Sequence, residues 1–508
     1  MRSFADNDNS PYVDLKPITV LIGKNSSGKS TFLRSLPLLR QSVEANTTGP
    51  ILWYSSYVDF GAFSEARKYD IEDNVIYFDF KIQLKPNTPN YISSYYNNLR
   101  RKILSSKDIN IIVEVGVTEI NNKTILKKLT LQLYDHKYKF IFSNEKKCDL
   151  YIDGVLSKIS DDLGYLNLNQ FLPLIGFWTK DYLRFDDEGL SEYFYNTLHS
   201  KIKKYFGNTS NSTIREGLIR IGLNERSEIK DVLIKIFKNN KTFIKNLERK
   251  ENEICDIAYQ LSLSASLCSI LITINNEIEN TFKNIKYIAP LRSTAERYYR
   301  HQDLQVKEID HTGSNLAMLL RSFSKKENDL FTQWTSKNFG FQVKVEEQGL
   351  HYALKIKAES DPREYNINDM GFGFSQILPI VASIWMETSK NKKLTLRHKR
   401  SDIIFAIEQP ELHLHPEYQA RLTKMFVSVI NAAKEKELSL KIIFETHSQT
   451  MVDTLGDCIE DGFLEPQDVN IVLFEKEINS STTKIKFSHF NKEGFLEEWP
   501  VGFFSGRR

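Results

Sequence analysis

The sequence GKNSSGKST at residues 23–31 lies between an apolar stretch, ITVLI at residues 18–22, and the segment FLRSL at residues 32–36. It matches the phosphate-loop pattern G-x-x-x-x-G-K-[ST], with a predicted strand before it and a predicted helix after it. In such a loop, backbone N–H groups surround phosphate oxygens, the lysine reaches the β- and γ-phosphates, and the serine can bind Mg²⁺. The sequence therefore predicts a nucleoside triphosphate site with these contact residues: Gly23, Asn25, Ser27, Gly28, Lys29, Ser30 and Thr31.

Composition and charge are those of an ordinary soluble protein with more than one lobe. The chain has 508 residues, which is more than a single hydrophobic core usually serves. Hydrophobic residues make up 41% of the chain, charged residues make up 26%, and the net charge is +3. Because this charge is nearly balanced, it does not predict a nucleic-acid partner, and any such partner has to be argued from local charge.

The cysteines and the apolar runs indicate a cytoplasmic protein without a membrane segment. The four cysteines are far apart and form no C-x-x-C pair, which is typical of buried thiols in a reducing compartment. They are Cys148, Cys255, Cys268 and Cys458. The N-terminus has no apolar core, and the longest apolar runs, such as residues 377–385, are too short to span a bilayer.

Patterns of extended and helical residues divide the chain into four predicted domains. Residues 71–156 alternate with the period of two that predicts an antiparallel sheet, and residues 190–283 have the apolar spacing of helices. Later strands alternate with helices, which is typical of a parallel sheet with helical crossovers. We place the domains at residues 1–185 (phosphate loop and antiparallel sheet), 186–285 (helical insertion), 286–460 (second α/β lobe) and 461–508 (small α/β extension).

Two predicted strands in the second lobe end in side chains that can serve a bound triphosphate. The apolar strand at residues 403–407 runs into Glu408, and a carboxylate at the end of a parallel strand can hold Mg²⁺ beside the phosphates. A second strand at residues 441–444 leads to His447, which it can deliver to the γ-phosphate. The pattern predicts a magnesium-dependent site in which Glu408 and Ser30 bind the metal.

A glycine-rich segment at residues 369–376 supplies a further candidate anion site. It precedes a predicted helix at residues 377–386, and a helix N-terminus with small residues ahead of it attracts negative charge. We expect this segment to act together with the phosphate loop.

Along the chain, the phosphate loop is followed by the glycine-rich segment, the strand that ends at Glu408 and the segment with His447. These four motifs and their order resemble those in the heads of ATP-binding-cassette ATPases. The chain is most similar to AAA ATPases of the overcoming-lysogenization-defect and Septu types, which are relatives of the RecF, Rad50 and SMC heads. The resemblance implies an α/β P-loop ATPase head with an antiparallel β lobe and a helical insertion. Besides the phosphate loop, the resemblance rests on residues 58–63, 287–292, 296–299, 371–376, 408–416, 446–448 and 498–504. Residues 498–504 are similar to a C-terminal domain found on a subset of these ATPases.

The resemblance implies a composite site shared by two subunits. The signature residues would act in trans on ATP held by the phosphate loop of a second copy, so that two ATP molecules close a homodimer or a higher oligomer. They are Gly371, Gly373, Ser375 and Gln376. His447 corresponds to the switch histidine, Glu408 to the Mg²⁺-side carboxylate, and Gln41 or residues 59–63 to the region that senses nucleotide.

One departure from the family concerns catalysis. Most cassette ATPases end this strand with Asp-Glu, and the second acid orients and polarises the attacking water, whereas this chain has Glu408-Gln409. Gln409 cannot accept a proton, so base assistance of about 10²–10⁴ in rate is lost unless Glu411 supplies it. We predict slow or conditional hydrolysis.

Three other groups of residues have competing interpretations. His413 and His415 with Glu411 suit an interface or structural role better than a metal site. Arg292 and Arg297 are either an interface pair or a phosphate-sensing pair. A stripe of basic residues at helical spacing is either a solvated face or a contact for nucleic-acid phosphates or an acidic partner. That stripe comprises Lys238, Lys241, Lys245 and Arg249.

No second catalytic centre is predicted in this sequence. About sixty residues follow His447, residues 469–474 and 484–490 in that stretch are predicted strands, and no His-Asn-His signature occurs. The leading hypothesis is therefore an ATPase subunit of a bacterial anti-phage defence complex, as in Septu systems or retrons, that regulates a separate effector, an HNH-type nuclease. The alternative is a RecF- or Rad50-like repair ATPase that clamps DNA; a transporter cassette fits the sequence less well.

Overall fold

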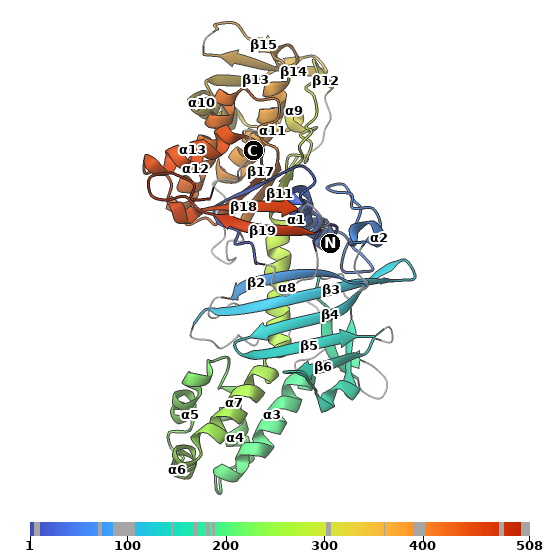
Figure 1. The fold of residues 1–508 in the computed structure, drawn as a ribbon, viewed down its shortest axis with the longest axis vertical. Helices are drawn as coiled ribbons and strands as arrows, with labels where there is room; N and C mark the ends of the chain where they lie inside the picture. The colour runs from blue at the N-terminus through green and yellow to red at the C-terminus, as the bar shows by residue number, and fades with distance from the viewer. Residues whose placement is uncertain are drawn as a thin grey trace.

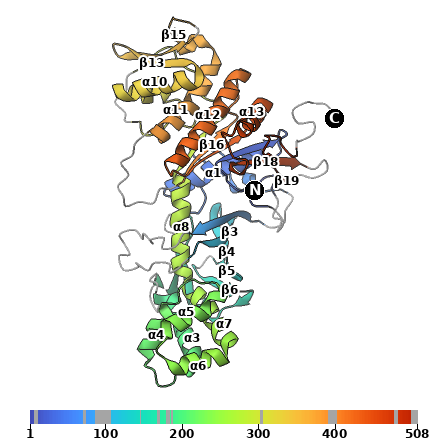
Figure 2. The same ribbon diagram turned by 90° about the vertical axis from the view of Figure 1, so that its left-hand side faces the viewer.

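The computed structural model has an elongated shape in which two lobes are stacked along the long axis (Figures 1 and 2). Helix α8 (Leu267–Lys283) connects the two lobes. The structure describes residues 1–4, 11–69, 74–84, 107–143, 146–166, 171–178, 183–184, 188–300, 306–359, 361–389, 402–476 and 482–498.

A six-stranded sheet forms the centre of the upper lobe. Its order is β11-β16-β17-β1-β18-β19, and all neighbours are parallel except β18 and β19. Parallel strands buried on both faces are continuous apolar runs, and this is why β1, β16, β17 and β18 were recognisable in the sequence. The strands are β11 (Ile285–Ile288), β16 (Ile403–Glu408), β17 (Leu440–Glu445), β1 (Ile18–Gly23), β18 (Val469–Lys476) and β19 (Thr483–Ser488).

Alternate residues of the central strands belong to two different hydrophobic cores. On β1, Val20 packs into a core with α11, α12 and α13, whereas Leu21 packs into the core that contains α1 and the lower lobe. Successive side chains of a strand point to opposite faces, so both faces are covered by helices. These helices are α1 (Lys29–Glu44), α11 (Phe372–Ser389), α12 (Pro416–Glu435) and α13 (Gln449–Glu460).

The predicted antiparallel sheet is confirmed and forms the upper part of the lower lobe. Its order follows the sequence from β2 to β7, with a register shift at Gly116/Val117. The strands are β2 (Ile76–Leu84), β3 (Ile109–Ile120), β4 (Lys123–Leu133), β5 (His136–Phe142), β6 (Cys148–Ile152) and β7 (Val155–Leu156). A smaller sheet contains β8 (Leu163–Leu166), β9 (Leu174–Trp178) and β10 (Leu183–Arg184).

Helices form the tip of the lower lobe, as the apolar spacing predicted. They are α3 (Glu188–Ile202), α4 (Asn211–Ile219), α5 (Ile229–Phe237), α6 (Lys241–Arg249) and α7 (Glu251–Ala265), followed by α8. Apolar residues of these helices, such as Leu233 and Leu247, belong to the same core as Leu33 of α1. Among the described residues, no single helix is long and apolar enough to cross a membrane, although the bent pair α7 and α8 passes that test of length and composition together.

A third packed unit covers the far end of the upper lobe. It contains the short helix α9 (Leu316–Arg321), the capped helix α10 (Lys325–Phe339) and a small sheet. The sheet strands are β12 (Tyr299–Arg300), β13 (Phe341–Gln348), β14 (His351–Ala358) and β15 (Tyr365–Asn366). The four-residue helix α2 (Phe63–Ala66) lies near the N-terminus (Figure 1).

Two details of the predicted organisation differ from the structure. The boundary at residue 460 runs through one sheet, because β18 pairs with β1 along the whole length of β1. Helix α11 begins at Phe372 and not at residue 377, since Gly371, with φ of 77°, provides the turn directly before it. All four cysteines are buried and free, as expected. The resemblance at residues 499–504 lies outside the described residues.

Candidate nucleotide site

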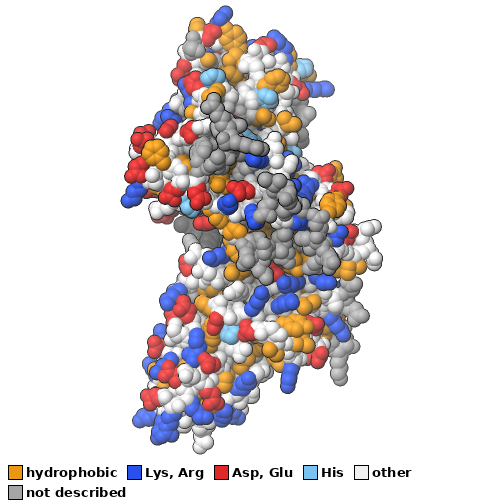
Figure 3. Space-filling view, in the orientation of Figure 1, with side chains coloured by type: hydrophobic (Ala, Val, Ile, Leu, Met, Phe, Trp, Pro, Cys, Tyr) orange, Lys and Arg blue, Asp and Glu red, His pale blue; other side chains and the backbone are white. Residues whose placement is uncertain are grey.

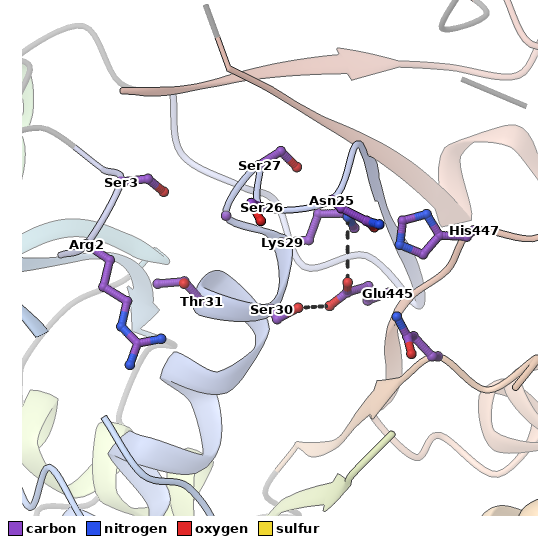
Figure 4. Close-up of a pocket in the computed structure, with 12 residues that line it drawn as sticks. Arg2, Ser3, Asn25, Ser26, Ser27, Lys29, Ser30, Thr31, Glu445 and His447 are labelled. Atoms are coloured by element: carbon purple, nitrogen blue, oxygen red, sulfur yellow. Dashed lines mark hydrogen bonds and ion pairs between the residues drawn. The ribbon is translucent and has the colours of Figure 1, made fainter. Parts of the chain in front are cut away.

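A pocket of about 420 Å³ opens at the carboxyl end of the central sheet, around the loop after β1 (Figure 4). Ligands of open α/β sheets bind at this edge, where the loops after the strands converge. Residues from four separated parts of the chain line the pocket. They are Arg2, Ser3, Asn25, Ser26, Ser27, Gly28, Lys29, Ser30, Thr31, Gln409, Glu445 and His447.

The predicted phosphate loop wraps tightly between β1 and α1. A Cβ added to Gly23 would lie 2.4 Å from the Phe474 carbonyl oxygen and 2.7 Å from Ser27 Oγ, so only glycine fits there. Gly28 has φ of 102° and directly precedes α1, whose first turn contains no acidic residue. The N-terminal end of α1 therefore presents backbone N–H groups and a positive dipole to the pocket.

The loop's polar side chains fit a triphosphate. Ser27 Oγ is buried and has no hydrogen-bond partner in the structure, and a buried polar atom of this kind calls for a ligand or water. Lys29 Nζ donates to the carbonyl oxygens of Gly23 (2.7 Å) and Lys24 (2.9 Å). Burial lowers the pKa of Lys29, so an anion beside its amine would stabilise the charged form.

Glu445, at the end of β17, is the carboxylate nearest to the phosphate-loop serine. Ser30 Oγ donates a hydrogen bond of 2.6 Å to Glu445 Oε2, and Lys29 Nζ lies 3.7 Å from Glu445 Oε1 (Figure 4). The side chain of Glu445 is 3% exposed, and burial raises its pKa. Hydroxyl and carboxylate oxygens are the ligands that Mg²⁺ prefers, so this pair fits a magnesium ion.

Protein side chains hold the carboxylate of Glu408 at the end of β16. Its carboxylate accepts two hydrogen bonds from Arg34 (2.7 and 2.8 Å) and one from the Tyr287 hydroxyl (2.7 Å). Glu408 is also absent from the pocket lining. The reason is the strand order, since β17 lies between β16 and β1 and places Glu445 next to the loop.

Gln409 and Glu411 follow β16 but lie in different environments. Gln409 lines the pocket with a left-handed backbone (φ of 42°). Glu411 is not part of the lining; its Oε1 accepts the backbone N–H of His447 at 2.8 Å, and its Oε2 is buried without a partner. Burial raises the pKa of Glu411. Gln409, and not Glu411, therefore lines the pocket.

A buried arginine, Arg292, contacts the backbone at the end of β16. Arg292 donates to the carbonyl oxygen of Glu408 at 2.8 Å, and its Nε and Nη1 atoms have no partner among the residues that the structure describes. It is 4% exposed, and burial lowers its pKa to about 10. Arg297, by contrast, is exposed and pairs with Asp369. The structure thus separates the two arginines that the sequence treated as a pair.

His447 reaches the pocket from the segment after β17, as predicted (Figure 4). Its pKa is lowered by burial and, to a smaller extent, by the charge of Lys29. The imidazole is therefore biased toward its neutral form, which can accept a hydrogen bond as well as donate one.

The signature segment lies away from the phosphate-loop pocket of the same chain. None of Gly371, Gly373, Ser375 and Gln376 lines that pocket. Ser375 is 5% exposed and donates to the Phe372 carbonyl oxygen at 2.7 Å, while Gln376 exchanges two hydrogen bonds with the backbone of Arg292. Gly371 and Phe372 are the members that face solvent.

Two other predicted residues have structural roles here. Gln41 is buried and bonds to the backbone of Leu52 and Val58, outside the pocket lining, which places it as a support for the segment before α2 and not as a nucleotide contact. His415 caps α12 by accepting from the Glu417 backbone N–H. No group of three or more potential ligand side chains that could hold a metal occurs among the residues that the structure describes.

The N-terminus contributes residues that sequence reasoning missed. Arg2 and Ser3 line the pocket, and the Thr483 hydroxyl of β19 lies 2.7 Å from Ser3 Oγ and 2.8 Å from the Ser27 carbonyl oxygen. These contacts join residues about 480 positions apart, so no local pattern could have revealed them.

The fold and the pocket together define a P-loop nucleotide-binding head. Comparison with known families agrees: the profile of the AAA ATPase domain family matches residues 8–452. Because the match spans most of the chain, the protein belongs to this ATPase family, and ATP is its expected nucleotide. A search of the curated proteins found no match.

Solved structures include several that are distantly similar to this chain. The SMC head domain of Pyrococcus furiosus, in complex with the C-terminal domain of ScpA, is 11% identical with a TM-score of 0.27, over 93% of this chain and 90% of that one. The SMC head domain of Thermotoga maritima is 7% identical with a TM-score of 0.28, over 92% and 89%. The recombination mediator protein RecF of the RecFOR pathway is 9% identical with a TM-score of 0.23, over 92% of each chain. These scores are too low to support an argument about this protein.

Proposed function

We propose that the protein binds Mg²⁺-ATP at the phosphate loop and that ATP closes a dimer in which each signature segment completes the other subunit's site. The observation that carries this proposal is the separation of the two halves: the pocket contains the phosphate loop, Gln409 and His447, but no signature residue. Lys29 and the N-terminal end of α1 hold the phosphates, and His447 faces them. A bound Mg²⁺ would neutralise charge on the phosphate oxygens.

ATP-dependent dimerisation tests this proposal directly. Light scattering of the wild type should show a larger assembly with ATP and Mg²⁺ than with EDTA. Phe372→Asp, which places a charge on the exposed end of the signature segment, should abolish the ATP-dependent increase while ATP still binds. Phe463→Asp is the matched control, since Phe463 is equally exposed (63% against 60%). An unchanged mass with ATP in the wild type would contradict the proposal.

Hydrolysis in this site is proposed to be slow. Gln409 lies in the pocket and cannot accept a proton, and Glu411, whose Oε1 is bonded to the His447 backbone, is absent from the lining. We expect a steady-state turnover well below the ~10 s⁻¹ enzyme median. Gln409→Glu should raise it about tenfold or more, because it supplies the missing base. A wild-type turnover equal to the enzyme median of ~10 s⁻¹ would contradict slow hydrolysis.

The biological setting we propose is a bacterial anti-phage defence complex in which ATP occupancy regulates a separate nuclease of the His-Asn-His type. The support is the motif resemblance to Septu-type ATPases. An ATP-dependent dimer that binds the effector better than the monomer would shift the effector between two states. Co-purification with the products of neighbouring genes, with Lys29→Ala as the comparison, tests this setting.

A second candidate function, DNA clamping, is favoured by one specific feature. The side chains of Lys241, Lys245 and Arg249 are exposed along α6, and that of Lys238 is exposed directly after α5. Figure 3 shows Lys and Arg side chains gathered at this lower tip. None of the four forms an ion pair with any residue that the structure describes, so all are available to phosphates. DNA binding by the protein alone, lost on reversal of these charges, would favour the clamp.

A further inference from the structure

Two buried glutamates end neighbouring strands of the central sheet. Glu408 of β16 and Glu445 of β17 are partners in the parallel ladder, so both lie at the same height of the sheet. Both are at most 3% exposed. Their surroundings nevertheless differ, and this difference decides which carboxylate is available to a ligand in the pocket.

The carboxylate of Glu408 is already neutralised by protein groups. Arg34 engages both of its oxygens in a two-pronged ion pair, and the Tyr287 hydroxyl adds a third hydrogen bond. Bidentate arginine–carboxylate pairs are among the stronger charge-assisted hydrogen bonds. A cation in the pocket would have to displace Arg34 to reach this group.

The carboxylate of Glu445 has weaker compensation. It accepts one hydrogen bond, from Ser30, and its nearest cationic group is Lys29 Nζ at 3.7 Å, beyond hydrogen-bond distance. Burying a charge without full pairing costs several kcal/mol. Glu445 also lines the pocket, and the hydroxyl that donates to it, Ser30 Oγ, is the one that a phosphate loop offers to a metal.

We propose that Glu445, and not Glu408, is the protein carboxylate that binds the divalent cation of the nucleotide together with Ser30. This inference rests on the proposed function, because it names the metal ligand of the same ATP site. In this arrangement Arg34 keeps Glu408 in a structural role. The negative charge next to the phosphates is the carboxylate of Glu445, at the end of β17, which is adjacent to β1.

The competing explanation is that Glu445 only balances the charge of Lys29. The two explanations differ in their effect on nucleotide binding without metal. If Glu445 faces the metal, its charge repels a metal-free polyphosphate, so removing the charge should strengthen binding in EDTA and weaken it with metal. If Glu445 only positions Lys29, its removal should change both affinities in the same direction.

The test measures the affinity of the full chain for a fluorescent ATP analogue, once in EDTA and once with saturating Mn²⁺ or Mg²⁺. For Glu445→Gln, which is similar in size to glutamate, we expect the advantage that metal gives to binding to fall about tenfold or more. Binding in EDTA should be tighter. Glu408→Gln, the same substitution at the paired strand position, should alter the metal advantage much less.

Each outcome decides between these explanations. A metal advantage equal to that of the wild type in Glu445→Gln, or a loss confined to Glu408→Gln, overturns the inference while the proposed function stands. If the wild type binds no nucleotide under either condition, the proposed function itself fails. Thermal unfolding shows whether each variant is folded; should Glu445→Gln not fold, Glu445→Asp, which withdraws the carboxylate by one methylene, must still reduce the metal advantage.

Discussion

Charged side chains occupy two contrasting environments in this molecule. At the carboxyl end of the central sheet, Lys29, Arg292 and Glu445 are buried, and two nitrogens of Arg292 have no hydrogen-bond partner among the described residues. On the surface of α6, Lys241 and Lys245 are exposed to solvent. Burying a charge costs several kcal/mol, whereas leaving one in water costs almost nothing. The buried group therefore indicates a function, and the exposed group alone indicates little.

The largest effect is expected from Lys29→Ala, which would show that the buried charges serve a ligand. Charge-assisted hydrogen bonds contribute about 1.5–3 kcal/mol each, so ATP affinity should fall on the order of a hundredfold. A fluorescent ATP analogue measures this loss. Lys24→Ala is the control, because Lys24 belongs to the same loop but its side chain is exposed. If Lys29→Ala binds ATP with wild-type affinity, the buried charge of Lys29 does not serve this ligand.

Arg34→Met tests whether a buried charge needs its partner. Among the described residues, it leaves Glu408 with the Tyr287 hydroxyl as its one side-chain donor. Removing one member of a buried pair costs about 3–5 kcal/mol, and partial exposure of Arg34 reduces this to about 2–3 kcal/mol in the free energy of unfolding. Urea denaturation measures it. The double variant Arg34→Met/Glu408→Gln should recover part of the loss; strictly additive losses would contradict the pairing.

Gly23→Ala changes the shape of the loop without changing any charge, so it separates the effect of close packing from the effect of buried charge. The new Cβ would meet the Phe474 carbonyl oxygen at 2.4 Å, and overpacking of this kind costs about 1–3 kcal/mol. Both the melting temperature and ATP affinity should fall. Gly154→Ala, in a turn where a Cβ meets nothing within 4 Å, should cost about 1 kcal/mol or less and leave ATP affinity intact. Equal losses in the two variants would disprove the close-packing argument.

The smallest effect on the folded protein is expected at α6. Reversing the charges of Lys238, Lys241 and Lys245 to Glu should change stability by no more than about 0.5 kcal/mol per site and should leave ATP affinity unchanged. Anisotropy of labelled duplex DNA over a salt series tests the clamp: if the three lysines contact phosphates, the salt slope should fall by about one per lysine. DNA binding that the triple variant leaves intact would remove the support for this function.

Sequence reasoning succeeded where a function depends on contiguous residues. The phosphate loop, the strands ending at Glu408 and Glu445, and the position of His447 follow from local patterns of glycine and apolar residues. It could not reveal which strands are neighbours: β17 lies between β16 and β1, so Glu445, and not Glu408, lies next to Ser30. The start of α11 was misplaced because Gly371 supplies the turn five residues earlier than the apolar run suggests.

The sequence by itself determined that this chain has a phosphate loop between a buried strand and a helix, because a glycine-rich loop with Lys29 and Ser30 fixes both the backbone path and the ligand chemistry. Only the tertiary structure decided that Arg2 and Ser3 reach the pocket, that Arg34 neutralises Glu408, and that Glu445 stands beside Ser30. Those contacts arise from strand order and from packing between residues hundreds of positions apart. Such packing leaves no periodic signal along the chain.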